Sequence, residues 1–197
     1  MTAIIYGVKP VWIGPMKVSR EQVAENRRRI LAAAGRLFRK RGFEAVTVAE
    51  VMRAAGLTHG GFYGHFRSKD DLIAQALEDV LSAGEPTGGD LSAYAAAYLS
   101  RPHCEDLAGG CPMAALGAEI PRQSPKARQA MTTGLRGQLD RLAASGPGGV
   151  PAERRRAAIG AWSAMVGALV LGRMSDDPAL ADEILTETRA WIDDRRP

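Results

Sequence analysis

Apolar residues recur at three- and four-residue spacing along most of the chain, and polar residues occupy the positions between them. Between residues 19 and 42 the apolar positions include Ile30, Leu37 and Phe38, while arginine and lysine fill much of the opposite face. This is the period of an amphipathic α-helix, and no stretch alternates between apolar and polar residues as a half-buried strand would. The pattern therefore predicts an all-α fold.

Capping signals divide the first eighty residues further. Thr47, with Glu50 three residues later, has the form of a capping box for a short second helix, which Gly56 ends. Thr58 is expected to cap a third short helix and Ser68 a fourth. A long helix, a short helix, a tight glycine turn and another short helix make a three-helix helix-turn-helix module.

The stretch from 82 to 90, SAGEPTGGD, is rich in Gly and Pro and predicts a domain boundary. We expect a flexible tail at 1–18, the helix-turn-helix domain at 19–82 and a second helical domain at 90–197. Met16 is an alternative translation start to Met1. In the second domain the pattern predicts helices at 91–99, 111–120 and about 124–145, a loop at 146–151, and two final helices, the last capped by Asp177 and opened by Pro178.

Charge is unevenly distributed along the chain. Residues 17–69 hold 12 Lys and Arg against 4 Asp and Glu, a net charge of +8, whereas residues 70–197 hold 13 against 18, a net charge of −5. A local excess of positive charge attracts a polyanion, most simply nucleic acid. The N-terminal module is therefore a candidate surface for double-stranded DNA.

The sequence offers little for catalysis. It has three histidines and two cysteines, Cys104 and Cys111, in no metal-ligand spacing. Runs typical of nucleotide binding or of a Ser/His/Asp triad are absent from it. We therefore expect no enzyme activity, no metal and no cofactor, and the low cysteine content favours the reducing cytoplasm.

The stretch from 57 to 69, LTHGGFYGHFRSK, places three glycines and three aromatic rings in one short helix. Glycine costs ~1 kcal/mol per helical site relative to alanine, so tertiary packing has to hold this helix. We expect Phe62 and Phe66 to anchor it in the core, with Tyr63 and His65 pointing outward. Small residues let a recognition helix approach the major groove of DNA closely.

Residues 27–81 resemble the N-terminal DNA-binding region of the TetR/AcrR family of bacterial repressors. The family's usual run is a capped second helix, A-G-V-S, a short recognition helix ending in Y-x-H-F, and then x-S-K; this chain has AAGLTHGGFYGHFRSK. His59 stands where lysine is frequent and Gly61 where threonine is frequent, so an operator preference does not transfer. The resemblance implies phosphate contacts by Thr47, Thr58, Tyr63, His65 and Lys69, and base reading at His59, Gly60 and Gly61.

Residues 157–172 contain one polar residue, Ser163, so this helix needs cover on both faces. Sixteen residues are short for a bilayer, which needs ~20, and we expect no membrane contact. A second copy of the chain is the better cover and resembles how the family dimerises, although an interior helix of a monomer is an alternative. The expected homodimer interface comprises Ile159, Trp162, Val166, Leu169, Val170, Ile184, Thr188 and Trp191.

The remaining apolar side chains of the second domain have two interpretations, plain core or the walls of an effector pocket. The candidates for pocket walls are Tyr94, Tyr98, Met113, Leu116, Met131, Trp162 and Met165.

Together these patterns predict a ligand-responsive transcriptional regulator, in the first place a repressor, that binds a palindromic operator as a dimer and is released by a small-molecule effector. One alternative is a repressor that senses oxidants or electrophiles through Cys104 or Cys111, beside a connection interpreted as flexible. Another is a constitutive, non-specific DNA-binding protein. The large acidic second domain argues against the latter, because packing DNA does not require it.

Overall fold

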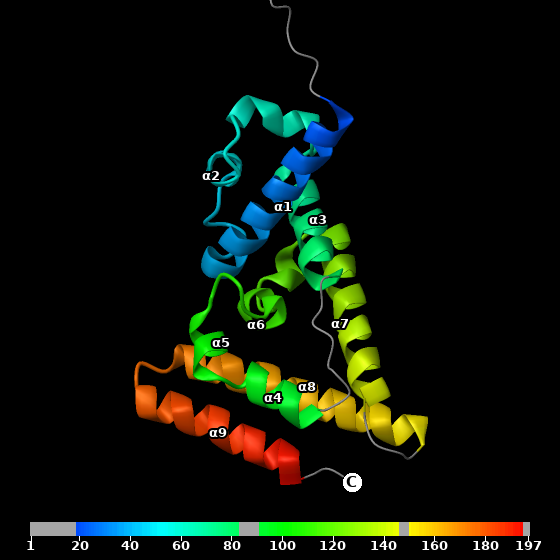
Figure 1. The fold of residues 1–197 in the computed structure, drawn as a ribbon, viewed down its shortest axis with the longest axis vertical. Helices are drawn as coiled ribbons and strands as arrows, with labels where there is room; N and C mark the ends of the chain where they lie inside the picture. Colours follow the sequence, from blue (N-terminus) through cyan, green and yellow to red (C-terminus); the bar gives the residue numbers. More distant parts are fainter. Residues whose placement is uncertain (1–18, 83–90, 146–149, 195–197) are drawn as a thin grey trace, which may run out of the picture.

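The computed structural model describes residues 19–82, 91–145 and 150–194, and every regular element in these ranges is helical (Figure 1). The expected tail and parts of the expected joint and loop, at 1–18, 83–90 and 146–149, lie outside the described residues. In chain order the elements are α1 (Arg20–Arg41), α2 (Val48–Ala54), the 3-10 helix η1 (His59–Gly64), α3 (Lys69–Ser82), α4 (Leu91–Tyr98), α5 (Arg101–Glu105), α6 (Pro112–Leu116), the 3-10 helix η2 (Ile120–Arg122), α7 (Pro125–Ser145), α8 (Pro151–Met174) and α9 (Pro178–Asp194).

Local capping places the first two helices where the sequence predicted them. The Ser19 hydroxyl accepts a hydrogen bond from the Gln22 N–H at 3.1 Å, and Gly42 ends α1 with a positive φ of 80°. At α2 the Thr47 hydroxyl accepts from the Glu50 N–H at 3.2 Å, and the Glu50 carboxylate accepts from the Thr47 N–H at 2.8 Å. The predicted capping box is therefore confirmed.

The third helix differs from the prediction in two respects. It is a six-residue 3-10 helix, and the Thr58 side chain makes no capping hydrogen bond. Its bonds are short in range, as between the Gly61 N–H and the Thr58 carbonyl at 3.1 Å. Three glycines in six residues do not sustain an α-helix, whereas a single tight turn requires fewer good helix formers. Phe62 and Phe66, both buried with ring centroids 5.7 Å apart, hold the turn in place as expected.

The helix predicted at 111–120 is broken in two. Helix α6 ends at Leu116, and η2 begins at Ile120 with Pro121 in its first turn. Between them, Glu119 points toward the helix-turn-helix module, where its Oε2 accepts a hydrogen bond from the Phe43 N–H at 2.9 Å. This side chain links the second half of the chain to the end of α1.

The segment between α4 and α6 is tied down, unlike the flexible connection that the sequence suggested. It contains α5, which the pattern did not predict although Ser100 caps it. Asp106 accepts a backbone N–H of the following turn at 2.7 Å, and Arg173 of α8 donates from Nε to the Cys104 carbonyl at 2.9 Å. Both Cys104 and Cys111 are buried.

Helix α3 lies between α1 and α7, and two glycines allow the close approach. A Cβ added at Gly35 of α1 would lie 2.7 Å from the Val80 side chain, and one at Gly134 of α7 would lie 2.7 Å from Leu81 Cβ. Such distances are below contact, so only glycine fits at either position. One apolar core runs from the helix-turn-helix module into the later helices, where it includes Leu116, Ala127, Ala130 and Met131.

Helices α8 and α9 run antiparallel at the end of the molecule opposite the helix-turn-helix module (Figure 1). Among the described residues, α8 is the one helix long and apolar enough to cross a membrane. One of its faces is packed inside the protein, where Ala158, Met165 and Leu169 join a second core with Leu185 of α9. The apolar composition of α8 is therefore accounted for by packing inside the protein.

We predict that Gly134→Ala destabilises the protein by about 1–3 kcal/mol, because its methyl group would overlap Leu81 Cβ. Gly137→Ala on the same helix is the matched control, since a Cβ there meets only the flexible end of Arg141, at 3.5 Å. It should raise stability by up to ~1 kcal/mol through helix propensity. Denaturant unfolding of both variants measures the difference, and equal effects would contradict the close packing of α3 on α7.

Candidate functional site

The η1 turn presents small and polar residues to solvent. Tyr63 is 75% exposed, and His59, Gly60 and Gly61 are exposed beside it. The residues predicted to hold phosphates lie on the elements around this turn. Thr47 and Thr58 are exposed at the starts of α2 and η1, whereas His65, at the end of η1, and Lys69, at the start of α3, are half-buried.

The glycines of η1 are not required by the protein's own packing. A Cβ added at Gly60 or Gly64 would meet nothing within 4 Å, and one at Gly61 would make only an ordinary contact with Met52 at 3.7 Å. None of the three has a positive φ, in contrast to Gly42 and Gly56. Neither the packing of the chain nor its backbone conformation therefore explains why glycine, a poor helix former, occupies these three positions.

Arg27 of α1 fixes the end of the turn. One of its guanidinium nitrogens donates to the His65 carbonyl at 3.2 Å, and another pairs with the Gln75 side chain of α3. Its guanidinium carbon lies 4.8 Å from the centroid of the Phe66 ring, a cation–π contact. The sequence does not reveal this role, because Arg27 stands in a run of three arginines with no feature that sets it apart.

The start of α2 carries a network of hydrogen bonds around Glu50. The Thr47 N–H, followed by the Arg41 guanidinium, lowers the pKa of the Glu50 carboxyl to about 2. The Thr47 hydroxyl also donates to Glu50 at 2.8 Å, so its proton is engaged within the cap. Lys69 reaches the Glu44 carbonyl at 3.5 Å, which keeps its ammonium beside the loop between α1 and α2.

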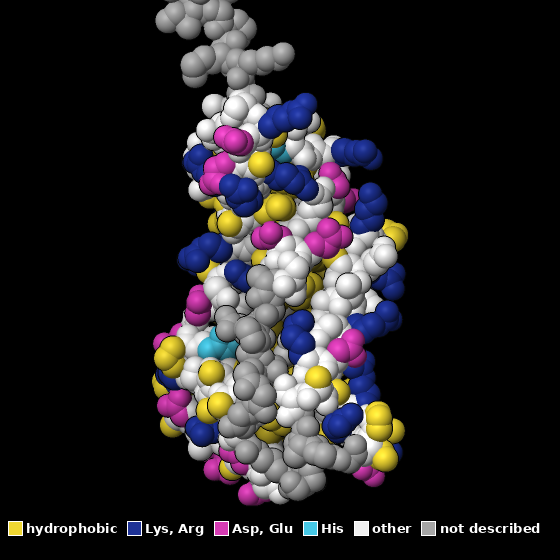
Figure 2. All heavy atoms as spheres, turned by 45° about the vertical axis from the view of Figure 1, so that its right-hand side comes forward, with side chains coloured by type: hydrophobic (Ala, Val, Ile, Leu, Met, Phe, Trp, Pro, Cys, Tyr) yellow, Lys and Arg dark blue, Asp and Glu magenta, His cyan; other side chains and the backbone are white. Residues whose placement is uncertain are grey.

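On the face drawn in Figure 2, several Lys and Arg side chains project from this end of the molecule, with a few acidic side chains among them. An exposed phenol, an imidazole and an ammonium group are hydrogen-bond donors for phosphate oxygens, and helix starts offer unpaired N–H groups to the same oxygens. A basic surface with a protruding, glycine-rich turn is therefore chemically suited to the backbone and groove of a nucleic acid.

The N-terminal module matches known regulators in sequence. Residues 30–76 fit the family described as bacterial regulatory proteins, tetR family. The chain is 43% identical over 63 residues to the transcriptional regulator TtgR of Pseudomonas putida, and 37% identical over 60 residues to the transcriptional repressor KstR2 of Mycolicibacterium smegmatis. These alignments cover 32% and 30% of this chain but only 30% and 29% of the two relatives.

The fold extends the likeness to most of the chain. The reduced form of NemR from E. coli superposes with a TM-score of 0.73 at 23% identity, over 86% of this chain and 97% of that chain. A TetR-family regulator from Agrobacterium tumefaciens does so with a TM-score of 0.69 at 19% identity, over 86% and 98%. The N-terminal module of this chain is therefore a TetR-family helix-turn-helix. The later helices share the TetR-family fold, while the sequence likeness is concentrated in the helix-turn-helix module.

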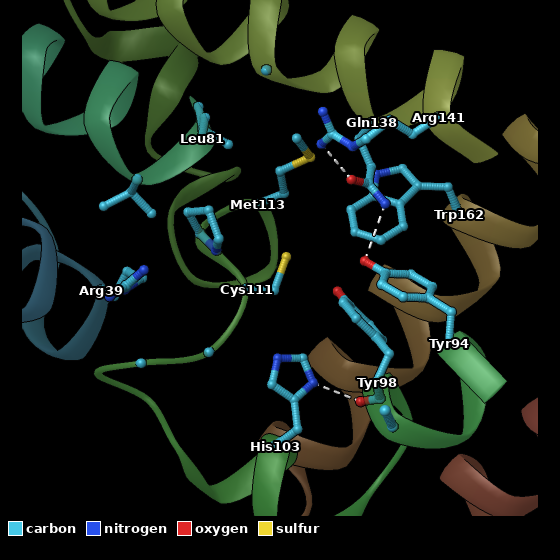
Figure 3. Close-up of a pocket in the computed structure, with 16 residues that line it drawn as sticks. Arg39, Leu81, Tyr94, Tyr98, His103, Cys111, Met113, Gln138, Arg141 and Trp162 are labelled. Carbon is cyan, nitrogen blue, oxygen red and sulfur yellow. Dashed lines mark hydrogen bonds between the residues drawn. The ribbon is translucent and has the colours of Figure 1, made fainter. Parts of the chain in front are cut away.

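Behind the helix-turn-helix module, the protein has a partly open cavity of about 450 Å³ (Figure 3). Arg39 of α1 and Val80 and Leu81 of α3 line it on one side, so it borders the module directly. Of the predicted pocket residues it is lined by Tyr94, Tyr98, Met113 and Trp162. The other three, Leu116, Met131 and Met165, lie in the two apolar cores instead.

Polar groups in the cavity wall form a chain of hydrogen bonds. Arg141 donates to the Gln138 side-chain oxygen at 2.7 Å, and the Gln138 amide nitrogen donates to the Tyr94 hydroxyl at 3.0 Å (Figure 3). Burial, followed by the neighbouring Cys111 thiol, raises the pKa of the Tyr98 hydroxyl. Burial also lowers the pKa of Arg39, whose Nε donates to the Ala108 carbonyl at 2.7 Å. The sequence did not predict Arg39, Gln138 and Arg141 as lining residues, since nothing in the pattern separates them from surface residues.

The predicted dimer residues divide into two groups. Trp162 and Leu169 are buried in the chain's own core, because the inner face of α8 packs on α7 and α9. Ile159 and Trp191 are exposed, and the other four, Val166, Val170, Ile184 and Thr188, are half-buried. Leu171 and Met174, which the prediction omitted, are exposed on α8 as well, and together these side chains make the apolar outer face of α8 and α9.

The low pKa of Glu50 makes a prediction about acid stability. A carboxyl whose pKa is lowered by folding stabilises the protein above its unfolded pKa of 4.5, and this stabilisation is lost as the pH falls toward about 2. Glu50→Gln cannot titrate, so the difference in melting temperature between wild type and variant should shrink from pH 4.5 to pH 2. A difference that stays constant over this range would contradict the carboxylate's part in the cap.

Proposed function

We propose that this protein is a DNA-binding transcriptional regulator of the TetR type that represses its target as a homodimer and is released by a small molecule. The observation that carries the proposal is the η1 turn, whose three glycines leave open space that the chain itself does not use. A backbone that DNA approaches closely would explain them. We place the protein in the cytoplasm, where its DNA lies, and assign it no catalytic role.

Recognition would be divided among the residues around η1. Tyr63, Thr58, His65 and Lys69 would bind phosphates, with Thr47 contributing through its helix start, because its hydroxyl proton already serves the cap. His59, Gly60 and Gly61 would face the base edges. Phosphate contacts fix the register of the protein on the duplex, and contacts with base edges select the sequence.

A palindromic operator would require two such turns at a fixed spacing. Two recognition helices reach successive major grooves only when they are ~34–36 Å apart, which one chain cannot provide. The apolar outer face of α8 and α9 suits contact with the same face of a second copy. Gly160 and Gly167 support this interface, since a Cβ at either would meet nothing within 4 Å in one chain, and bare helix backbone lets a partner helix approach.

Release would pass from the cavity to the DNA-binding module through α1 and α3. Arg39, Val80 and Leu81 line the cavity and belong to that module. The Arg39–Ala108 and Phe43–Glu119 hydrogen bonds then tie both ends of the segment around α6 to the end of α1. A ligand that prefers a different position of these walls would shift the spacing of the two turns, and ~2.7 kcal/mol of preference suffices for a 100-fold loss of affinity.

A thiol-based version of the same regulator is the second candidate, favoured by the position of Cys111 in the cavity wall. An electrophile small enough to enter the cavity would meet this sulfur. Both thiols are buried, however, and neither lies on an open loop. The ligand-binding mode is therefore the better supported of the two.

The first prediction of the proposal concerns phosphate contacts. On a duplex enriched by the wild type from random sequences, Tyr63→Phe and Lys69→Ala should lower affinity by a factor of about 10 to 10⁴, because ~0.5–3 kcal/mol is lost in each of two subunits. Lys69→Ala should also make log affinity less dependent on log salt, by ~0.9 per contact per subunit. His59→Ala should relax base preference instead. Arg189→Ala, on α9, is the control for a charge remote from DNA.

A substitution at Gly60 should separate folding from DNA binding. Gly60→Ala should leave the melting temperature unchanged or raise it, since its Cβ has open space, yet lower DNA affinity by about 10- to 100-fold through overlap with the duplex. Gel-shift titrations with thermal melts measure both quantities. If Gly60→Ala and Tyr63→Phe bind the duplex as the wild type does, η1 is not the DNA-reading element.

The dimer face predicts a separate set of variants. Leu169→Glu would unfold the chain, because Leu169 is buried in its own core, so the outer positions are the informative ones. Ile159→Glu with Leu171→Glu, at positions 46% and 52% exposed in one chain, should give a folded monomer in sedimentation. Leu135→Glu on α7, at a position 38% exposed, is the matched control and should remain a dimer. A dimer that survives the double variant places the interface elsewhere.

The buried thiols predict that oxidants do not release the DNA. Wild type and a Cys104→Ser, Cys111→Ser variant should bind the enriched duplex equally well, and peroxide or a maleimide should dissociate neither complex. Dissociation of the wild-type complex alone would decide for the thiol-based alternative.

A further inference from the structure

The charged side chains in the cavity wall are all basic. Arg39 and Arg141 line the cavity together with the His103 ring, and no Asp or Glu is among its lining residues in the described part of the chain. Asp106 lies near Arg39 and offsets part of that charge. Arg141 makes no ion pair with any described residue, so its charge is balanced least. A partly open cavity with this wall favours an anion.

Two donors in this wall have no nitrogen or oxygen partner. Nε of Arg141 and the hydroxyl of Tyr98 are both buried without such a partner among the described residues, and the Tyr98 hydroxyl has only the Cys111 thiol, a weak partner, beside it. An unpaired buried donor is costly, more so when it belongs to a charged group. Since both are shielded from water, a ligand reaches them only with a small rotation of these side chains. An acceptor that carries negative charge would satisfy both at once.

Three aromatic side chains, Tyr94, Tyr98 and Trp162, lie together in the wall beside small and aliphatic residues. The Tyr98 ring lies edge-on to Trp162, with centroids 5.2 Å apart, and edge-on to His103 at 4.6 Å, while Tyr94 lies 6.0 Å from it (Figure 3). Flat rings pack in these offset and edge-on arrangements, and Met113 adds an adaptable thioether. A volume of about 450 Å³ accommodates a molecule of one or two rings.

We propose that the cavity binds a small aromatic carboxylate, with its carboxylate group at Arg141 and Tyr98 and its ring against Tyr94 and Trp162. The inference names the ligand class of the effector site and rests on the proposed function only for the consequence that binding releases DNA. Gln138, held between Arg141 and Tyr94, would fix the direction of the guanidinium.

The test compares 1-naphthoate with its neutral amide, 1-naphthamide, and with the cationic 1-naphthylmethylamine, by calorimetry on the full-length protein. Naphthoate should bind about 10- to 100-fold more tightly than the amide, as one charge-assisted contact predicts, and the amine should bind most weakly. Arg141→Gln should remove the preference for naphthoate over the amide. Arg136→Gln, an exposed arginine of the same helix, should retain it.

Tyr98→Phe is a second, milder variant, and it should weaken naphthoate by about 3- to 10-fold while leaving the amide unchanged. Equal affinity for naphthoate and amide, tighter binding of the amine, or no binding of any probe would overturn the ligand class. Naphthoate that binds as predicted but leaves the DNA complex intact supports the ligand class and rejects release by this site. Release of DNA by a neutral or cationic compound alone supports release by an effector and rejects the aromatic carboxylate as its class.

Discussion

The position of the helix-turn-helix module on the later helices depends on the close packing of α3 between α1 and α7. Gly35 and Gly134 let Val80 and Leu81 approach to distances that no side chain would allow. The first turn of α3 follows the η1 turn, and its last turn lines the cavity. One helix therefore belongs both to the core that anchors Phe62 and Phe66 and to the wall of the proposed ligand site. A packed core transmits displacement because it has little room to absorb it.

Two hydrogen bonds at the end of α1 add a second connection between the module and the later helices. Arg39 and the Phe43 N–H are engaged by Ala108 and Glu119, which lie on either side of α6. The connection between the halves of the chain is thus apolar along α3 and polar along α1. In the proposed switch, a ligand that displaces the cavity wall would act on the module through both contacts.

The sequence predicted what depends on local patterns and short-range chemistry. The cap at Thr47, the long helices and the burial of Phe62 and Phe66 follow from spacing and residue type. The interruption of the 111–120 helix did not, because Glu119 has its partner at Phe43, 76 positions earlier in the chain. Because α8 is apolar on all sides, its sequence did not reveal which face packs inside the chain. Trp162 and Leu169 were therefore assigned to the dimer interface, although they are buried in the chain's own core. Tyr94, Tyr98 and Trp162, which the sequence offered as pocket walls, line the cavity. Arg39, Gln138 and Arg141 line it as well but could not be proposed from the sequence, because their position in the cavity depends on residues far away in the chain.

The central claim is that η1 is the surface that meets DNA, and site-specific photocrosslinking tests it most directly. A benzophenone side chain would be placed at His59, exposed on η1, and in a second protein at Leu135, exposed on α7. On irradiation with the enriched duplex, the account predicts a covalent DNA adduct from position 59 and none from position 135. An adduct from position 135 alone, under conditions in which both proteins bind the duplex, would contradict it.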